Sequence, residues 1–131
     1  MQSGEEVPYD KLLVATGSRP FVPPMDGLDG VKNKFSFMTW DDMDALEKAL
    51  SPKKKVLVIG AGLIGLKCVE GIAERVGSVT VVDLADRILP SILDGEGAAI
   101  IQRQLEAKGI KFILNDCAAK FEGKKVTLKN S

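Results

Sequence analysis

Residues 54–83 constrain the fold of this chain more than any other segment. They begin with an apolar run at positions 56–59, which lacks the polar alternation of a half-exposed strand. Such a run is typical of a parallel strand that is buried on both faces. Gly60, Gly62 and Gly65 follow it directly, in the order G-x-G-x-x-G. This order predicts a strand, a tight turn and a helix, the unit that holds a dinucleotide by its pyrophosphate.

Each of the three glycines meets a different physical demand. Gly60 lets the chain turn sharply out of the strand, Gly62 leaves room for the pyrophosphate, and Gly65 lets the helix pack close to the sheet. A helix that opens near Leu63 would direct its unpaired N–H groups and its positive dipole end at the phosphates. The predicted cofactor-binding turn therefore comprises Gly60, Ala61, Gly62, Leu63, Ile64 and Gly65.

A second apolar run, at 79–82, predicts the next buried strand, and Asp83 ends it. Its carboxylate stands roughly 20 residues past the glycines, where it can accept hydrogen bonds from the hydroxyls of an adenosine ribose. The same charge would repel a 2′-phosphate, so the sequence favours NAD(H) over NADP(H). Arg87 could bind such a phosphate, which keeps NADP(H) as the less favoured alternative. The predicted cofactor-binding residues beyond the turn are Asp83, Leu84 and Arg87.

Composition argues against several other functions. The 131 residues allow one domain with part of another, and the formal net charge is zero with no basic block beyond residues 53–55, which argues against nucleic acid as a partner. The sequence contains no signal peptide and no apolar stretch of the ~18 residues that a membrane span needs, so we expect a cytoplasmic protein. There is no histidine, and Cys68 and Cys117 are isolated. Neither a metal site nor a catalytic side chain is therefore predicted, and chemistry would come from a cofactor.

The N-terminal third contains fewer regular elements. Residues 11–16 have the pattern of a short buried strand, and the proline-rich and glycine-rich stretch 17–29 reads as a connector. An amphipathic helix is predicted over 41–50, with Thr39 as its cap and Asp42 as the partner in a capping box. Trp40 is expected to anchor this helix to the rest of the domain.

The C-terminal part continues the alternation of strands and helices. A helix is predicted over 96–108, with Ala98, Ile101 and Leu105 on its buried stripe, followed by a third strand at 111–114. Residues 118–128 read as a β-hairpin. The whole pattern predicts an α/β fold: a Rossmann-like doubly wound parallel sheet with helices on both faces and a small β-hairpin.

Three ordered motifs carry a resemblance to a known family. They are YDKLLVATGSRP at 9–20, the glycine unit, and DRILP at 86–90. Together they resemble the FAD-dependent pyridine nucleotide-disulfide oxidoreductase family, and within it the group of NADH oxidases, rubredoxin reductases and NADH-dependent nitrite reductases. The resemblance implies that the glycine unit binds NAD(P)H, and that hydride passes from the nicotinamide to FAD. It also implies that the residues near FAD are Ala15, Thr16 and Gly17.

The resemblance implies a division of the chain as well. Residues 1–24 would be a remnant strand and linker of an FAD-binding domain, and 25–131 the NAD(H)-binding domain. The partners would then be NADH and the missing FAD-binding domain of the same polypeptide, while the redox acceptor stays unknown. Alone, the chain would bind NADH without turnover. Lys67 departs from the family pattern, in which a Glu often stands near the nicotinamide.

Two other functional classes fit parts of the sequence. A regulatory NAD(H)-sensing module without chemistry of its own would use the same glycine unit, although it would have no use for the A-T-G segment at 15–17. An S-adenosylmethionine methyltransferase also has a glycine-rich turn, which usually runs G-x-G-x-G. Here Ile64 stands at the position of the third glycine in that pattern, so this alternative ranks lowest.

Overall fold

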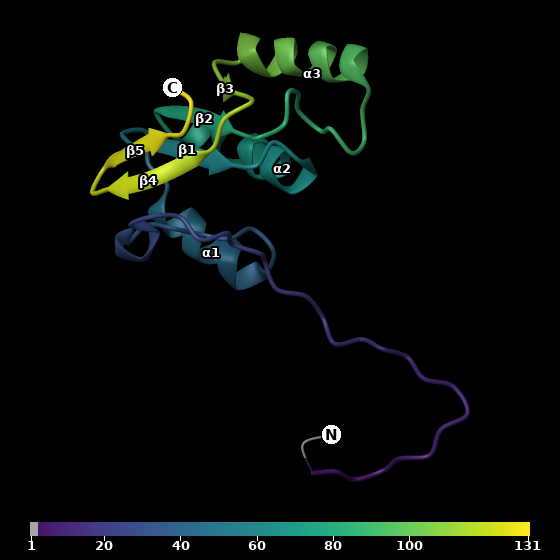
Figure 1. Ribbon diagram of the computed structural model, residues 1–131. Coiled ribbons are helices and arrows are strands. Elements are labelled where there is room, and N and C mark those ends of the chain that lie inside the picture. Colours follow the sequence, from purple (N-terminus) through teal and green to yellow (C-terminus); the bar gives the residue numbers. More distant parts are fainter. Residues whose placement is uncertain (1–2) are drawn as a thin grey trace.

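The computed structural model describes residues 3–131, and Figure 1 shows its elements. From residue 40 onward, three α-helices alternate with the strands of a parallel sheet, and a two-stranded sheet follows at the C-terminal end. In chain order the elements are η1 (Leu28–Gly30), α1 (Trp40–Ala49), β1 (Lys55–Ile59), α2 (Leu63–Ile72), η2 (Ala73–Arg75), β2 (Ser78–Val82), α3 (Gly95–Ala107), β3 (Lys111–Ile113), β4 (Ala118–Glu122) and β5 (Lys125–Leu128).

The first three strands form one parallel sheet in the order β1-β2-β3. Val58 lies beside Val81, and Val81 lies beside Phe112 in the register of this sheet. The β4–β5 pair forms a separate antiparallel hairpin. The α/β class, the Rossmann-like parallel sheet and the hairpin are thereby confirmed.

The apolar core lies between one face of the parallel sheet and the helices. Because side chains alternate along a strand, Val79 and Val81 of β2 point to the same face. Both are buried in one cluster with residues from each helix and from the loops around them. The buried members of this cluster are Leu46, Ala61, Val69, Ile72, Val76, Val79, Val81, Ile88, Ala98 and Ile110. The core thus includes a residue of the glycine turn and one of the loop that follows β2.

Helix α1 begins with the predicted capping box. The Asp42 N–H donates to the Thr39 hydroxyl at 3.1 Å, and the Thr39 N–H donates to the Asp42 carboxylate at 2.9 Å. The Thr39 N–H, followed by the Met38 N–H and the Ser36 hydroxyl, donates to this carboxylate and lowers the pKa of Asp42. The prediction that Trp40 anchors this helix is wrong, since its side chain is 81% exposed. The helix is buried through Leu46 instead, and six residues at 3.6 per turn separate the two side chains by about 120° around the axis.

Helix α3 buries less of its apolar stripe than its periodicity predicts. Ala98 is buried and Leu105 packs against the core, but Ile101 is 38% exposed and was wrongly assigned to the buried stripe. Strand β3 has only three residues and forms an edge of the sheet. Such a short edge strand offers little sheet surface for a helix to cover.

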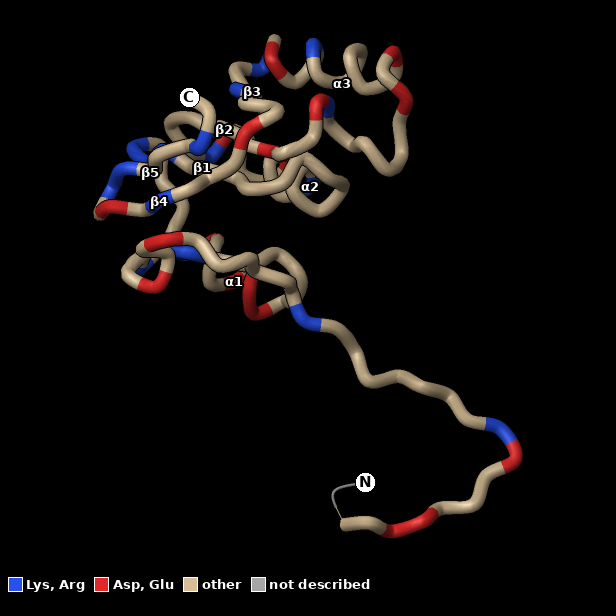
Figure 2. The backbone as a smooth tube through the Cα atoms, in the orientation of Figure 1, with Lys and Arg blue, Asp and Glu red and all other residues tan. Residues whose placement is uncertain are grey.

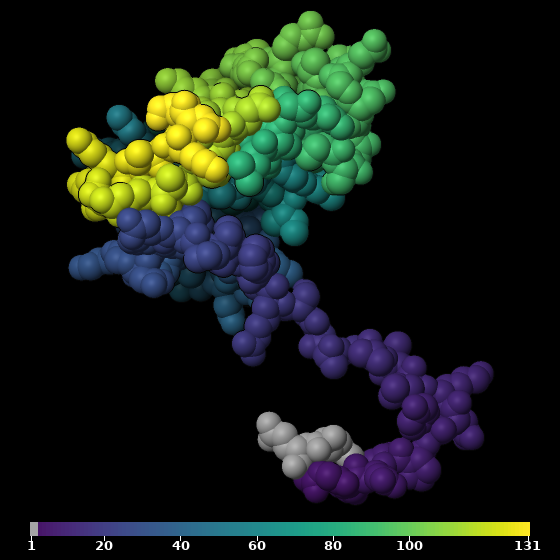
Figure 3. All heavy atoms as spheres, in the orientation of Figure 1, coloured from purple at the N-terminus to yellow at the C-terminus, as the bar shows by residue number. Residues whose placement is uncertain are grey.

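The strand predicted at 11–16 is not formed. Residues 3–24 contain no helix or strand, and their side chains are exposed, with Leu13 at 86%. The segment extends away from the folded part of the chain in Figures 1 and 3. A strand needs a neighbour that pairs with its backbone N–H and C=O groups, and the described chain places none beside this segment. Pairing with the rest of the fold begins at Asp26, which forms a bridge with Lys120 of β4.

A buried carboxylate that the sequence did not mark holds the C-terminal residues in place. Asp116 is 1% exposed, and one of its oxygens accepts the backbone N–H groups of Cys117, Lys129 and Asn130 at 2.8–3.0 Å. The other oxygen accepts the Ser131 hydroxyl at 2.7 Å. These hydrogen bonds lower the pKa of Asp116, and the one from the Ser131 hydroxyl has the largest effect. The carboxylate thereby joins the start of the hairpin to the chain beyond β5.

Charged residues of both signs are distributed along the chain, with lysines along the hairpin (Figure 2). No helix within residues 3–131 has the length and apolar character needed to cross a bilayer.

Candidate dinucleotide-binding site

The glycine turn lies between the carboxyl end of β1 and the start of α2. Gly60 has φ 109°, in the region that side chains disfavour, so the sharp turn at this position requires glycine. Its N–H donates to the Val82 carbonyl oxygen at 2.8 Å, which ties the turn to the end of β2. Ala61, the next residue, is completely buried. The ends of the two strands and the turn thus form one compact unit.

The third glycine of the motif controls how closely α2 approaches this turn. A Cβ atom built on Gly65 would lie 2.0 Å from the carbonyl oxygen of Gly60, a distance that real Cβ atoms do not reach. The first turn of α2 therefore packs directly on the backbone that leaves β1. A Cβ atom on Gly62 would meet nothing within 4 Å, so the space beside that residue is open.

The N-terminus of α2 presents unpaired backbone donors. Gly62 is the N-cap and provides no side-chain cap, and the Leu66 N–H donates to its carbonyl oxygen at 3.0 Å. The N–H groups of the helix before Leu66 consequently have no partner within the helix. Leu63 and Ile64 are exposed at this end. Free N–H groups and the positive end of the helix dipole make such a terminus suitable for an anion.

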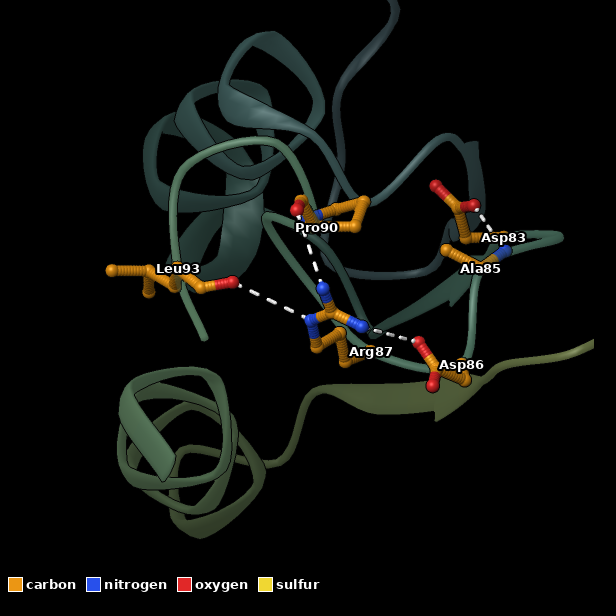
Figure 4. Close-up of polar contacts among 6 residues, drawn as sticks. All are labelled: Asp83, Ala85, Asp86, Arg87, Pro90 and Leu93. Atoms are coloured by element: carbon orange, nitrogen blue, oxygen red, sulfur yellow. Dashed lines mark hydrogen bonds and ion pairs between the residues drawn. The ribbon is translucent and has the colours of Figure 1, made fainter. Parts of the chain in front are cut away.

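Asp83 lies beside the turn, at the end of β2, and is half-buried. One of its carboxylate oxygens accepts the Ala61 N–H at 2.5 Å, and the other accepts the Ala85 N–H at 2.8 Å. Figure 4 shows the second of these hydrogen bonds. The contact with Ala85, two residues along the chain, is a local turn that an Asp readily forms. The contact with Ala61 spans 22 residues, and no local pattern of residues indicates it.

The loop after β2 is tied to the glycine turn by a separate contact. The Leu89 N–H donates to the Ala61 carbonyl oxygen at 2.9 Å, and the neighbouring Ile88 is completely buried in the core. Leu84, a predicted site residue, is exposed at the start of this loop. The structure therefore brings Leu84 and Asp83 to the same end of the sheet as the turn.

Arg87 directs its guanidinium group to acceptors within its own loop (Figure 4). Its Nη1 atom lies 2.9 Å from a carboxylate oxygen of Asp86, and its Nε atom lies 3.4 Å from the Leu93 carbonyl oxygen. A third donor, Nη2, lies 3.5 Å from the Pro90 carbonyl oxygen. A phosphate at this position would compete with these contacts.

Residues 15–17 and the side chain of Lys67, both singled out from the sequence, do not contact the glycine turn. Residues 15–17, expected near FAD, are in the exposed N-terminal segment and are not brought to the glycine turn (Figure 1). Lys67, where the family pattern often has Glu, is exposed on α2 and forms an ion pair with Glu70 at 2.5 Å. This pair lowers the pKa of Glu70.

The cysteines and acidic residues form no second reactive centre in the part of the chain that the structure describes. Cys68 is half-buried on α2, and burial raises the pKa of its thiol, which disfavours the reactive thiolate. No group of three or more Cys, Asp or Glu side chains within residues 3–131 could hold a metal ion.

The parallel sheet, the glycine turn, the uncapped start of α2 and the acid at the end of β2 define a Rossmann-type α/β domain. Residues 1–131 match the family model described as pyridine nucleotide-disulphide oxidoreductase. The chain belongs to this family, as the sequence motifs indicated.

Curated relatives include oxidases and reductases of several substrates. The chain is 43% identical over 123 residues to an NADH oxidase of Methanocaldococcus jannaschii, with 91% of this chain and 27% of that protein covered. It is 34% identical over 110 residues to the large subunit of a nitrite reductase (NADH) of Escherichia coli, with 83% of this chain and 13% of that protein covered. The chain therefore spans about a quarter or less of the length of these relatives.

Solved structures agree with this assignment. A water-forming NADH oxidase of Lactobacillus brevis, bound to NADH, superposes with a TM-score of 0.80 at 28% identity, over 92% of this chain and 27% of that chain. An FAD-dependent pyridine nucleotide-disulphide oxidoreductase of Desulfovibrio vulgaris gives a TM-score of 0.70 at 27% identity, over 92% and 32% of the two chains. Homologues of this chain are thus flavin-dependent and NADH-dependent oxidoreductases.

Proposed function

We propose that this chain is the NADH-binding part of an FAD-dependent oxidoreductase and presents the nicotinamide for hydride transfer to the flavin. The observation that carries the proposal is the open, uncapped start of α2 directly after the glycine turn, with Asp83 beside the turn. The bound NADH of the Lactobacillus brevis relative supports it.

The pyrophosphate of the dinucleotide would lie on the backbone at the start of α2. The free N–H groups of Leu63, Ile64 and Gly65 are its proposed donors, and the helix dipole favours the negative charge. The open space beside Gly62 leaves room for the phosphates to approach the backbone. The binding of the pyrophosphate would then need no cationic side chain.

The adenosine ribose would lie against Asp83. A carboxylate oxygen can accept more than one hydrogen bond, so the contacts with Ala61 and Ala85 leave capacity for the ribose hydroxyls. A 2′-phosphate would bring a second negative charge to this carboxylate, which favours NADH over NADPH. Arg87 is bonded within its loop and would have to leave those contacts to offset the repulsion.

An engineered relative supports the role of this region in the choice of cofactor. A mutant of the Lactobacillus brevis oxidase, described as an NADPH oxidase and bound to NADPH, has an Asp replaced by Ala eighteen positions after a Gly replaced by Ala. Gly65 and Asp83 have the same spacing in this chain. The same mutant carries three further replacements within seven positions after that Asp, so we infer that Asp83 and the loop after it together contribute to the preference for NADH here.

The flavin would be held outside the part of the chain that binds NADH. FAD supplies the acceptor for the hydride in such enzymes. We propose that residues 1–24 belong to the FAD-binding side, with Ala15, Thr16 and Gly17 near the flavin, and that 25–131 form the NADH-binding domain. On this proposal the chain alone binds NADH without turnover. The relatives act on different acceptors, so the proposal names none.

The proposal is tested by isothermal titration of the chain with NADH and, separately, with NADPH. We expect saturable NADH binding, weaker NADPH binding, and a loss of at least about tenfold in NADH affinity in Asp83→Ala. Asp41→Ala removes an exposed charge on α1 and is the matched control, for which we expect NADH affinity within about twofold of the unsubstituted chain. The proposal is wrong if a chain shown to be folded by circular dichroism binds neither nucleotide.

A further inference from the structure

We propose that Asp83 is also the positioning residue of the glycine turn, so that one carboxylate both binds the ribose and fixes the backbone that binds the pyrophosphate. The observation is the hydrogen bond from the Ala61 N–H to Asp83 Oδ2 at 2.5 Å. Ala61 is the residue between the first two glycines of the motif and is completely buried. The positioning role stands on this contact alone, and the coupling to ribose rests on the function proposed above.

The contact fixes the turn because both backbone polar groups of Ala61 are held, one in the peptide before it and one in the peptide after it. Its N–H donates to Asp83, and its carbonyl oxygen accepts the Leu89 N–H at 2.9 Å. The carboxylate is itself oriented by the Ala85 N–H at 2.8 Å. A hydrogen bond to an ionised carboxylate is stronger than one between neutral groups, so the Asp83 contact is the stronger of the two that hold Ala61.

The geometry transmits this constraint to the proposed phosphate donors. Only Gly62 separates Ala61 from Leu63, the first residue of α2. A change in the orientation of the Gly60–Ala61 peptide, which Asp83 holds, therefore moves the start of the helix and its free N–H groups. A buried N–H that loses its acceptor has no water to replace it, so the turn must shift to satisfy it.

Replacing Asp83 has two effects that can be measured separately. Ala at this position removes both the ribose acceptor and the acceptor of the Ala61 N–H. Asn has a single acceptor oxygen, so it keeps one of the two backbone contacts at best. If Asp83 acted on the ribose alone, neither substitution would disturb a ligand that lacks ribose hydroxyls, and the loss of a negative charge would favour an anionic ligand.

The first experiment needs no nucleotide. Proton–nitrogen correlation spectra and amide hydrogen exchange of the 131-residue chain report on the Ala61 and Leu89 N–H groups separately. In Asp83→Ala we expect the Ala61 amide resonance to move upfield and its exchange to accelerate at least about tenfold, while Leu89, whose acceptor is the carbonyl oxygen of the next peptide, changes less. Asp83→Asn should give a smaller change at Ala61, and Asp41→Ala, at an exposed residue of α1, should change neither amide. Unchanged protection of Ala61 in Asp83→Ala would overturn the proposal.

The second experiment uses 2′,3′-dideoxy-ADP, which has a pyrophosphate but no ribose hydroxyls. We expect Asp83→Ala to weaken its binding about tenfold and Asp83→Asn to weaken it less, although both remove a negative charge. Affinity equal to or above that of the unsubstituted chain would contradict the coupling and leave Asp83 as a ribose ligand only. If the unsubstituted chain binds neither NADH nor this probe, the proposed function fails, and the exchange experiment still decides the positioning role.

Discussion

The Gly60 carbonyl oxygen lies where a side chain at Gly65 would begin, 2.0 Å from the Cβ position. Gly65→Ala must therefore displace the start of α2 from the turn. We expect it to lower the free energy of unfolding by about 1–3 kcal/mol, the range for inserting an atom into a well-packed site. The displaced N–H groups should also weaken NADH binding. Urea unfolding followed by circular dichroism measures the first effect and isothermal titration the second.

Gly71→Ala on the same helix is the matched control. A Cβ atom there would meet nothing within 4 Å, and Ala favours a helix over Gly by up to about 1 kcal/mol. We expect this variant to be as stable as the unsubstituted chain or more so, with unchanged NADH affinity. Equal losses of stability in the two variants would show that the close contact at Gly65 is not the cause.

Arg87 should stabilise its loop and contribute little to the choice of cofactor. Its three donors face Asp86, Pro90 and Leu93, so Arg87→Ala removes contacts within the loop. We expect a loss of about 1 kcal/mol in the free energy of unfolding, and a ratio of NADH to NADPH affinity that changes less than about twofold. Arg103→Ala on the exposed side of α3 serves as the control. A selective loss of NADPH binding would instead show that Arg87 binds the 2′-phosphate.

Asp116 should make the stability of the chain sensitive to acid. Its pKa is lowered in the folded chain by the Ser131 hydroxyl and by backbone N–H groups, so the folded state binds its proton less readily than the unfolded state does. The carboxylate therefore contributes its full stabilisation above its ordinary pKa of 3.8 and loses it as the pH falls through the lower folded value. Asp116→Asn should be less stable than the unsubstituted chain by several degrees in melting temperature at pH 7.

The measurement for Asp116 is the difference in urea midpoint between the two chains from neutral to acidic pH. We expect this difference to stay constant from about pH 7 to pH 5 and to shrink below the ordinary pKa of an aspartate. Asp10→Asn, in the exposed N-terminal segment, controls for the loss of one charge. A difference that does not vary with pH would mean that the ionised form of Asp116 is not what stabilises the fold.

The elements that the sequence predicted are those that depend on neighbours along the chain. The strand, glycine turn and helix at 55–72 follow from a local apolar run and three glycines, and the box formed by Thr39 and Asp42 follows from a spacing of three residues. The strand predicted at 11–16 failed because its apolar pattern needs a pairing partner, which no local signal supplies. The prediction that Trp40 anchors α1 failed for a related reason, since the surface that a short helix packs against decides which of its sides is buried.

In the candidate site as well, the sequence predicts the residues but not the long-range contacts between them. The glycines and Asp83 were found from spacing, because the family of βαβ units repeats that spacing. The hydrogen bond between Asp83 and Ala61 joins residues 22 positions apart, and the Asp116 contacts join residues up to 15 positions apart. Neither carboxylate differs in sequence from an ordinary acid at a strand end or in a loop. Only the folded backbone shows which N–H groups they accept.

The exposed N-terminal segment should be dispensable for the stability of the folded part. No residue of 3–24 is buried, and Phe21 is exposed, whereas Phe37 packs against the core. We expect deletion of residues 1–24 to change the melting temperature by less than about 2 °C. Phe21→Ala should be similarly neutral, but Phe37→Ala should cost about 1–3 kcal/mol because it removes packing from the core. Differential scanning fluorimetry compares the three variants directly. A large destabilisation on deletion of 1–24 would show that this segment packs on the domain in solution, and the proposed boundary between residues 24 and 25 would then be wrong.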